Sequence, residues 1–163
     1  MIRSTFFALV LGLVSSVLAT AHAQDGGPTA PQTSPEASYQ RTTAMKIRIG
    51  VGDKIVTASL IDNATSRDFV SLLPISLTLK DYADTEKVSD LPRKLSTDGA
   101  LPDSDPSVGD IAYYAPWGNL AIFYRDFRYS SGLIKLGKID SGIEALNVTG
   151  PTNVTVELID QAP

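Results

Sequence analysis

The sequence contains no cysteine, and its single histidine, His22, lies close to its start. Without cysteine the chain has no disulfide bond, no thiol nucleophile and no thiolate ligand for a metal ion. If residues 1–23 are removed, as argued below, the remaining chain also lacks the histidine that serine–histidine and cysteine–histidine catalytic pairs require. We therefore expect a domain that is held together by its apolar core alone, with neither a metal site nor a cofactor.

The chain also has little excess charge, with 14 basic and 18 acidic residues and a formal net charge of −4. Its basic residues form no stripe of the kind that binds nucleic acid. They form no basic amphipathic helix of the kind that lies on a membrane surface. We therefore expect no nucleic-acid partner and, once a signal peptide has been removed, no membrane insertion. The oligomeric state is left open.

Four aspartates stand close together in the sequence, at Asp98, Asp103, Asp105 and Asp110. Carboxylate oxygens are the usual ligands of calcium. However, a calcium loop of the EF-hand type that began at Asp103 would need glycine where Val108 stands and glutamate where Tyr114 stands. The preferred interpretation is therefore solvated loop carboxylates and turn caps, and a structural metal is the alternative.

The first 23 residues have the features of a secretory signal peptide. Arg3 supplies a positive start, and residues 6–18 form an apolar stretch that is short for a bilayer span. Ala21 and Ala23 place small residues at the two positions that signal peptidase reads. We expect cleavage before Gln24 and a periplasmic or secreted protein. An uncleaved anchor is the alternative.

Residues 24–44 are rich in Pro, Thr, Ser, Gly and Ala and show no apolar periodicity. Such a segment cannot bury enough apolar surface to offset the entropy lost on ordering. We expect a disordered linker here. The folded domain is predicted over residues 45–160, which is long enough for one core.

Short apolar runs with turn signals between them predict a mainly-β domain of seven or eight strands, as a barrel or a sandwich. Strands are predicted at 45–50, 55–60, 75–79, 111–114, 120–124, 132–139 and 153–159. Between the fourth and fifth, the sequence Ala-Pro-Trp-Gly at 115–118 suits a tight turn and predicts a β-hairpin. A short helix is predicted over 66–73, with Thr65 and Asp68 as a capping box and Pro74 ending it. A further helical turn is predicted around 86–91.

Two stretches of the sequence resemble cyclophilins. Residues 136–144 (LGKIDSGIE) are similar to a stretch near the cyclophilin C-terminus, and residues 64–72 (ATSRDFVSL) resemble the first cyclophilin helix. Residues 45–146 as a whole resemble the bacterial and archaeal cyclophilin-like domain family, through runs such as LPRKLS, GDIAYYAPWGNLAIFY and SSGLIKLG. This resemblance implies a closed, eight-stranded β-barrel with a helix at an open end. It brings no established reaction with it.

True cyclophilins isomerise X–Pro peptide bonds, and the resemblance implies that reaction as the alternative function. Their arginine matches Arg93 within Leu91-Pro92-Arg93, so Arg93 is the candidate catalytic residue. The phenylalanine and histidine beside that arginine are missing here, as are the pocket histidine and glutamine. We therefore favour a non-catalytic or weakly catalytic binding module for a small ligand or an extended, proline-containing peptide. Whether the chain is an enzyme is left open.

The candidate ligand-binding residues are Arg93, Tyr114, Trp117 and Phe123. Apolar pockets with a few polar groups are typical binding sites, and this part of the chain is rich in aromatic residues. The cyclophilin geometry implies that Arg93 lies beside the aromatic hairpin, on the outer face of the barrel. There its guanidinium would suit an amide, a carboxylate or a planar ring. The alternative is that the aromatics fill the core, Trp117 plugs the end of the barrel and Arg93 points to water.

Overall fold

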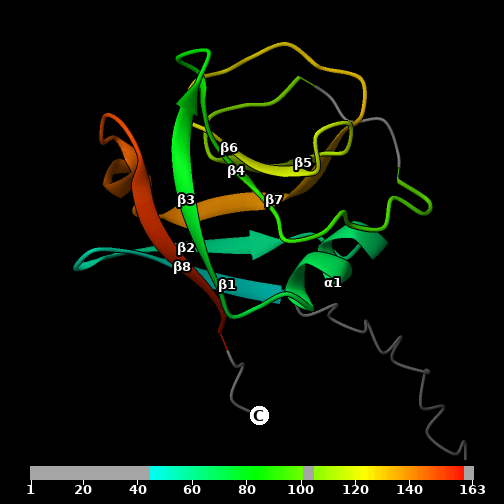
Figure 1. Cartoon of the computed structure of the whole chain (residues 1–163), viewed down its shortest axis with the longest axis horizontal. Helices are drawn as coiled ribbons and strands as arrows, with labels where there is room; N and C mark the ends of the chain where they lie inside the picture. Colours follow the sequence, from blue (N-terminus) through cyan, green and yellow to red (C-terminus); the bar gives the residue numbers. More distant parts are fainter. Residues whose placement is uncertain (1–44, 101–104, 160–163) are drawn as a thin grey trace, which may run out of the picture. The chain divides into compact units, whose positions relative to one another are not determined.

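The computed structural model describes residues 45–100 and 105–159. The predicted signal peptide (1–23), the predicted linker (24–44) and the last residue of the predicted domain, Asp160, lie outside this part of the chain. Within it the chain forms eight strands, one α-helix and one 3-10 helix. The strands close into an antiparallel barrel in the order β1-β2-β7-β5-β6-β4-β3-β8, as Figure 1 shows. The predicted mainly-β closed barrel is therefore confirmed.

The predicted strands are all present, with bounds that shift by a few residues at most. The eight strands are β1 (Met45–Val51), β2 (Lys54–Leu60), β3 (Ile75–Tyr82), β4 (Glu86–Asp90), β5 (Asp110–Tyr114), β6 (Asn119–Phe123), β7 (Leu133–Ser141) and β8 (Thr152–Leu158). The predicted hairpin across residues 115–118 joins β5 to β6, whose residues pair in register from Ile111 with Ile122 to Tyr114 with Asn119.

Alternation of side chains along the strands fills the barrel. Side chains two residues apart share one face of a strand, so every second residue points into the core. On β2 the sequence left the inward face open, and the structure buries Val56, Ala58 and Leu60. The main core also takes in Phe69 of the helix and apolar residues from the other strands. The interior of the barrel is therefore occupied by side chains.

The predicted helical turn at 86–91 is wrong, because this segment is strand β4. It pairs with β6 on one side, from Glu86 opposite Phe123 to Asp90 opposite Asn119, and with β3 on the other. The five residues Glu-Lys-Val-Ser-Asp carry too little apolar patterning to identify a strand on their own. Pairing with two neighbours decides the conformation here, as tertiary context often does for β-structure.

Helix α1 (Ala64–Val70) begins two residues earlier than predicted, and the predicted capping box is also wrong. The helix is capped by Asn63, whose side-chain oxygen accepts a hydrogen bond from the Ser66 backbone N–H at 2.7 Å. Thr65 is buried within the helix. The short 3-10 helix η1 (Ile143–Leu146) follows β7. Among the described residues, no helix combines the length and the hydropathy needed to cross a bilayer.

The contact between β2 and β7 explains one glycine of the LGKIDSG stretch. A Cβ placed on Gly137 would lie 2.2 Å from the Ser59 backbone oxygen and 2.8 Å from the Leu60 Cα. Real Cβ contacts are never so short, so only glycine allows β2 and β7 to approach this closely.

Candidate functional site

A second cluster of apolar side chains lies on the outside of the barrel, over β4, β5, β6 and β7. The register brings it together, since Ala121 pairs with Val88 of β4 and with Ala112 of β5, and Tyr114 pairs with Leu133 of β7. The buried members are Ala112, Ala121, Phe123 and Leu133, and Val88, Tyr114, Phe127 and Tyr129 pack against them. An outer barrel face would ordinarily be polar, so this apolar face is a feature that requires an explanation.

This outer face is hollowed into a cleft of about 280 Å³. Small side chains on the central strands, Ala121 and Val88 among them, leave the hollow between larger neighbours. Its lining comes from strands β3 to β7, from the β3–β4 and β5–β6 turns and from the segment between β6 and β7: Tyr82, Ala83, Glu86, Val88, Tyr114, Trp117, Asn119, Ala121, Phe123, Phe127, Arg128, Ser130 and Leu133.

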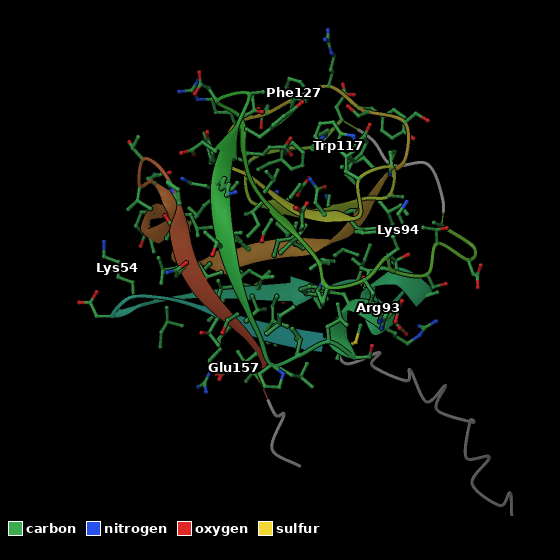
Figure 2. The ribbon with its side chains drawn as sticks, in the orientation of Figure 1. Lys54, Arg93, Lys94, Trp117, Phe127 and Glu157 are labelled. Atoms are coloured by element: carbon green, nitrogen blue, oxygen red, sulfur yellow. The ribbon has the colours of Figure 1, made fainter. Side chains whose placement is uncertain are left out.

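Trp117 joins the two sides of the cleft. Its ring lies edge-on to Tyr114, with centroids 5.3 Å apart, and edge-on to Tyr82, with centroids 5.4 Å apart. Edge-to-face contacts of this kind are favourable for aromatic rings. Even so, Trp117 remains 56% exposed. It therefore does not plug the barrel, and Figure 2 shows it on the same side of the molecule as Phe127.

Tyr82 reaches the cleft from the last position of β3, next to the turn that leads to β4. The turn residues Ala83 and Asp84 have φ angles of +50° and +54°, in the left-handed region that residues other than glycine seldom adopt. Two successive positive φ angles are typical of the type I′ turn that joins the strands of a β-hairpin, and the Thr85 backbone N–H closes this turn by donating to the Tyr82 carbonyl oxygen at 3.1 Å. The turn places Tyr82 and Ala83 in the lining of the cleft.

Two of the polar groups in the cleft are hydrogen-bond acceptors. Glu86 is half-buried, and burial raises the pKa of its carboxyl group to about 7. Asn119 is 4% exposed, and its side-chain oxygen has no hydrogen-bond partner among the described residues. The basic residue of the lining, Arg128, is exposed and holds its guanidinium carbon 5.8 Å from the centre of the Phe127 ring.

The structure brings three of the four sequence-predicted site residues into this one cleft: Tyr114, Trp117 and Phe123. It places Arg93 elsewhere, and Figure 2 shows Arg93 beside helix α1, away from Trp117. The Arg93 guanidinium donates to both carboxylate oxygens of Asp68, at 2.6 and 2.9 Å, and to the Ser71 hydroxyl at 2.9 Å. The expected position of Arg93 beside the aromatic hairpin is therefore not what the structure shows.

Asp68 explains why Arg93 is held at the helix. Its side chain also accepts the Ser96 backbone N–H at 2.7 Å, so one carboxylate fixes α1 to the 93–96 segment. The hydrogen bond from Arg93, followed by that from Ser96, lowers the pKa of Asp68 to about 2. The same Asp68 carboxylate raises the pKa of Arg93. This bidentate pair has the geometry of a structural clamp.

The sequence patterns did not identify four of the cleft residues, namely Tyr82, Glu86, Asn119 and Arg128. Strand periodicity over residues 86–90 places Glu86 and Val88 on one face, whereas the sequence pattern there predicts a helical turn. Tyr82 and Asn119 carry no local signal, because only the closing of the barrel brings the β3–β4 turn next to the β5–β6 hairpin. Within residues 45–100 and 105–159, no group of three or more acidic or histidine side chains is arranged to hold a metal ion.

A similar fold is found among the solved structures. The solution structure of the hypothetical protein AF2241 from Archaeoglobus fulgidus superimposes with a TM-score of 0.54. The two sequences are 21% identical, and the match covers 73% of this chain and 98% of that chain. At this identity the likeness establishes the barrel fold alone.

No curated protein matches the chain. Residues 49–157 match the Cyclophilin-like family. This span runs from the middle of β1 to the second-last residue of β8. It includes every strand that contributes to the cleft and the helix that holds Arg93. The chain belongs to the cyclophilin-like family.

Proposed function

We propose that this cyclophilin-like domain is a binding module and that its ligand site is the aromatic cleft over β4, β5, β6 and β7. Its occupant is a small ligand or the side chains of an extended peptide. One observation carries the proposal: an outer barrel face holds a hollow of about 280 Å³ that is walled by aromatic rings and contains a buried acceptor with no partner among the described residues. Concave, mostly apolar sites with a few polar groups are the usual form of ligand pockets.

The geometry supports binding more than prolyl isomerisation. The candidate catalytic arginine, Arg93, is engaged by Asp68 and Ser71 and is not part of the cleft lining. In the cleft itself the basic side chain is Arg128, which is exposed and lies over Phe127. An arginine that weakens the resonance of a prolyl amide must be held beside the bound proline. Arg93 lies outside the cleft, and no described side chain fixes the guanidinium of Arg128 by a hydrogen bond or an ion pair.

Trp117 is the only tryptophan in the sequence, so its fluorescence reports on the cleft directly. We expect the emission of the mature protein to shift when members of a library of short extended peptides and small aromatic compounds bind. The variant Ala121→Leu, which fills the floor of the cleft, should lose this response, and its thermal unfolding is measured alongside to show that the variant is folded. Ile55→Leu, on an exposed position of β2, is the matched control. A response that survives in Ala121→Leu would place binding elsewhere.

A proline-isomerisation assay on the same protein tests the alternative function, which is prolyl isomerase activity. Strong catalysis that Arg93→Ala abolishes would contradict the proposal. Little or no acceleration, with an unchanged fluorescence response in Arg93→Ala, is the result that we expect.

A further inference from the structure

We propose that the cleft recognises an organic cation, with Glu86 as the counter-ion of the ligand's ammonium group and the rings of Tyr82, Trp117 and Phe123 around it. This inference rests on the proposed function, since it names the chemical class of the ligand that occupies the same cleft. It commits to a ligand that combines a positive head with an apolar or aromatic body.

The first support is that Glu86 has a place in the cleft but no ionic partner. It stands on β4 opposite Tyr82 on one side and Phe123 on the other, and all three line the cleft. No basic side chain in the described part of the chain forms an ion pair with it, whereas seven other basic side chains pair with aspartates or glutamates. A half-buried carboxylate without a partner carries a desolvation cost that a bound cation offsets.

The second support is the arrangement of rings around this carboxylate. The face of an aromatic ring is electron-rich, and cations are held between several such faces in sites that recognise ammonium groups. Trp117 lies edge-on to both Tyr82 and Tyr114, so these three rings form one continuous group at the opening of the cleft. Tyr82 and Phe123 also flank Glu86 by strand pairing, which puts rings and carboxylate at the same end.

The third support is the character of the remaining polar groups. Asn119 adds a buried acceptor to which no group in residues 45–100 and 105–159 donates, and which is also suited to an N–H donor. The charged side chains of the lining are Glu86 and Arg128, and its other titratable side chains are Tyr82 and Tyr114. Arg128 is exposed and lies over Phe127, so its charge is screened by solvent. The interior of the cleft therefore favours a donor with positive charge over an anion.

Two small probes of the same shape test this proposal. Phenethylamine is cationic at neutral pH, and phenethyl alcohol is its neutral counterpart. Binding to the mature protein is followed by Trp117 fluorescence and by calorimetry. We expect phenethylamine to bind about tenfold more tightly than phenethyl alcohol, and to bind more tightly at pH 8 than at pH 6, because ionised Glu86 is the form that pairs with it.

Three variants separate the contributions. Glu86→Gln, which keeps the shape of the side chain, should bring the two probes to within about twofold of each other and remove the pH dependence. Glu144→Gln, at an exposed glutamate of η1, is the matched control and should behave like the wild type. Arg128→Gln should leave amine binding unchanged or strengthen it. Weaker amine binding in Arg128→Gln would mean that removing a positive charge from the cleft does not favour the cation, and would overturn the proposal.

The outcomes also distinguish this proposal from the one on which it rests. If both probes bind equally to the wild type and to Glu86→Gln, and binding is lost in Ala121→Leu, the proposed cation recognition is overturned. The cleft remains the binding site in that case. If neither probe binds, the proposed cation recognition is likewise overturned. The peptide screen alone would then test whether the cleft is a binding site. If peptides bind, those that contain lysine should bind about tenfold more tightly than matched peptides that contain norleucine. The absence of that preference would again overturn the proposed cation recognition.

Discussion

Glu86 is the residue whose ionisation we expect to affect the free energy of unfolding most clearly near neutral pH. Its pKa is about 7 in the folded protein against an ordinary value of 4.5, so between these values the folded state holds a proton that the unfolded state has lost. The stability that this proton provides is complete below about pH 4.5 and is lost as the pH rises through 7. Allowing for solvent screening of a half-buried group, the loss is about 1–2 kcal/mol.

Denaturant unfolding of the wild type and of Glu86→Gln between pH 4 and 9 measures this loss. We expect the variant to be more stable than the wild type at pH 8 and close to it at pH 4.5. The comparison is clean because the sequence beyond His22 contains no histidine that would titrate in the same range. Parallel curves for the two proteins over the whole range would contradict the account.

Asp68 gives a second prediction, with the opposite sign. Its pKa is lowered to about 2 from 3.8 by Arg93 and Ser96, so its contribution is present above pH 4 and is lost as the pH falls towards 2. Asp68→Asn should lower the free energy of unfolding at pH 7 by about 1 kcal/mol and flatten the acid limb of the stability curve. Asp62→Asn, which removes an exposed ion pair with Arg67, is the control and should change less. Identical acid limbs for wild type and Asp68→Asn would show that the clamp is not formed.

Phe69 is the apolar side chain that helix α1 buries in the main core of the barrel. The seven residues of the helix are too few to be stable alone, so packing must hold it. Phe69 is 0% exposed and belongs to the main core. Phe69→Ala should therefore cost about 3–5 kcal/mol in denaturant unfolding. Ile55→Ala, at a residue that is 60% exposed, should cost less than about 0.5 kcal/mol. A loss below about 1 kcal/mol for Phe69→Ala would mean that the helix is not docked as described.

The strands whose alternation is strong were predictable from the sequence, and β4 was not. In β1 and β2 apolar residues recur at every second position, and the hairpin across residues 115–118 has clear turn residues. In β4 the inward position facing Ile122 is Lys87, whose side chain is 2% exposed and pairs with Asp81 at 2.7 Å. A lysine inside a barrel does not fit the apolar alternation by which strands are recognised.

The candidate site was predicted in part for a related reason. Tyr114, Trp117 and Phe123 lie on one hairpin, so local patterning was enough to group them. Glu86, Tyr82 and Asn119 join them only through strand pairing across the closed barrel. The placement of Arg93 depended on Asp68, a residue 25 positions away that the sequence suggested only as part of a helix cap.

At the scale of the whole molecule, the predicted signal peptide and linker remain predictions. Residues 1–23 should be removed on export, because their charge, apolar stretch and small residues match what signal peptidase requires. We expect N-terminal sequencing of the mature protein, recovered from the periplasm or the medium, to begin at Gln24. Protein that accumulates in the cytoplasm with Met1 or Ile2 at its start would overturn both the cleavage and the export.

The central claim is that ligands bind in the aromatic cleft on the outer face of the barrel. The most direct measurement is the change of amide and indole NMR shifts across the ¹⁵N-labelled protein as a probe or peptide is added. The account predicts that the largest changes fall on β4, β6, the segment between β6 and β7 and the Trp117 indole, and that Ala121→Leu removes them. Changes centred instead on Arg93, Asp68 and helix α1, or left intact by Ala121→Leu, would contradict it.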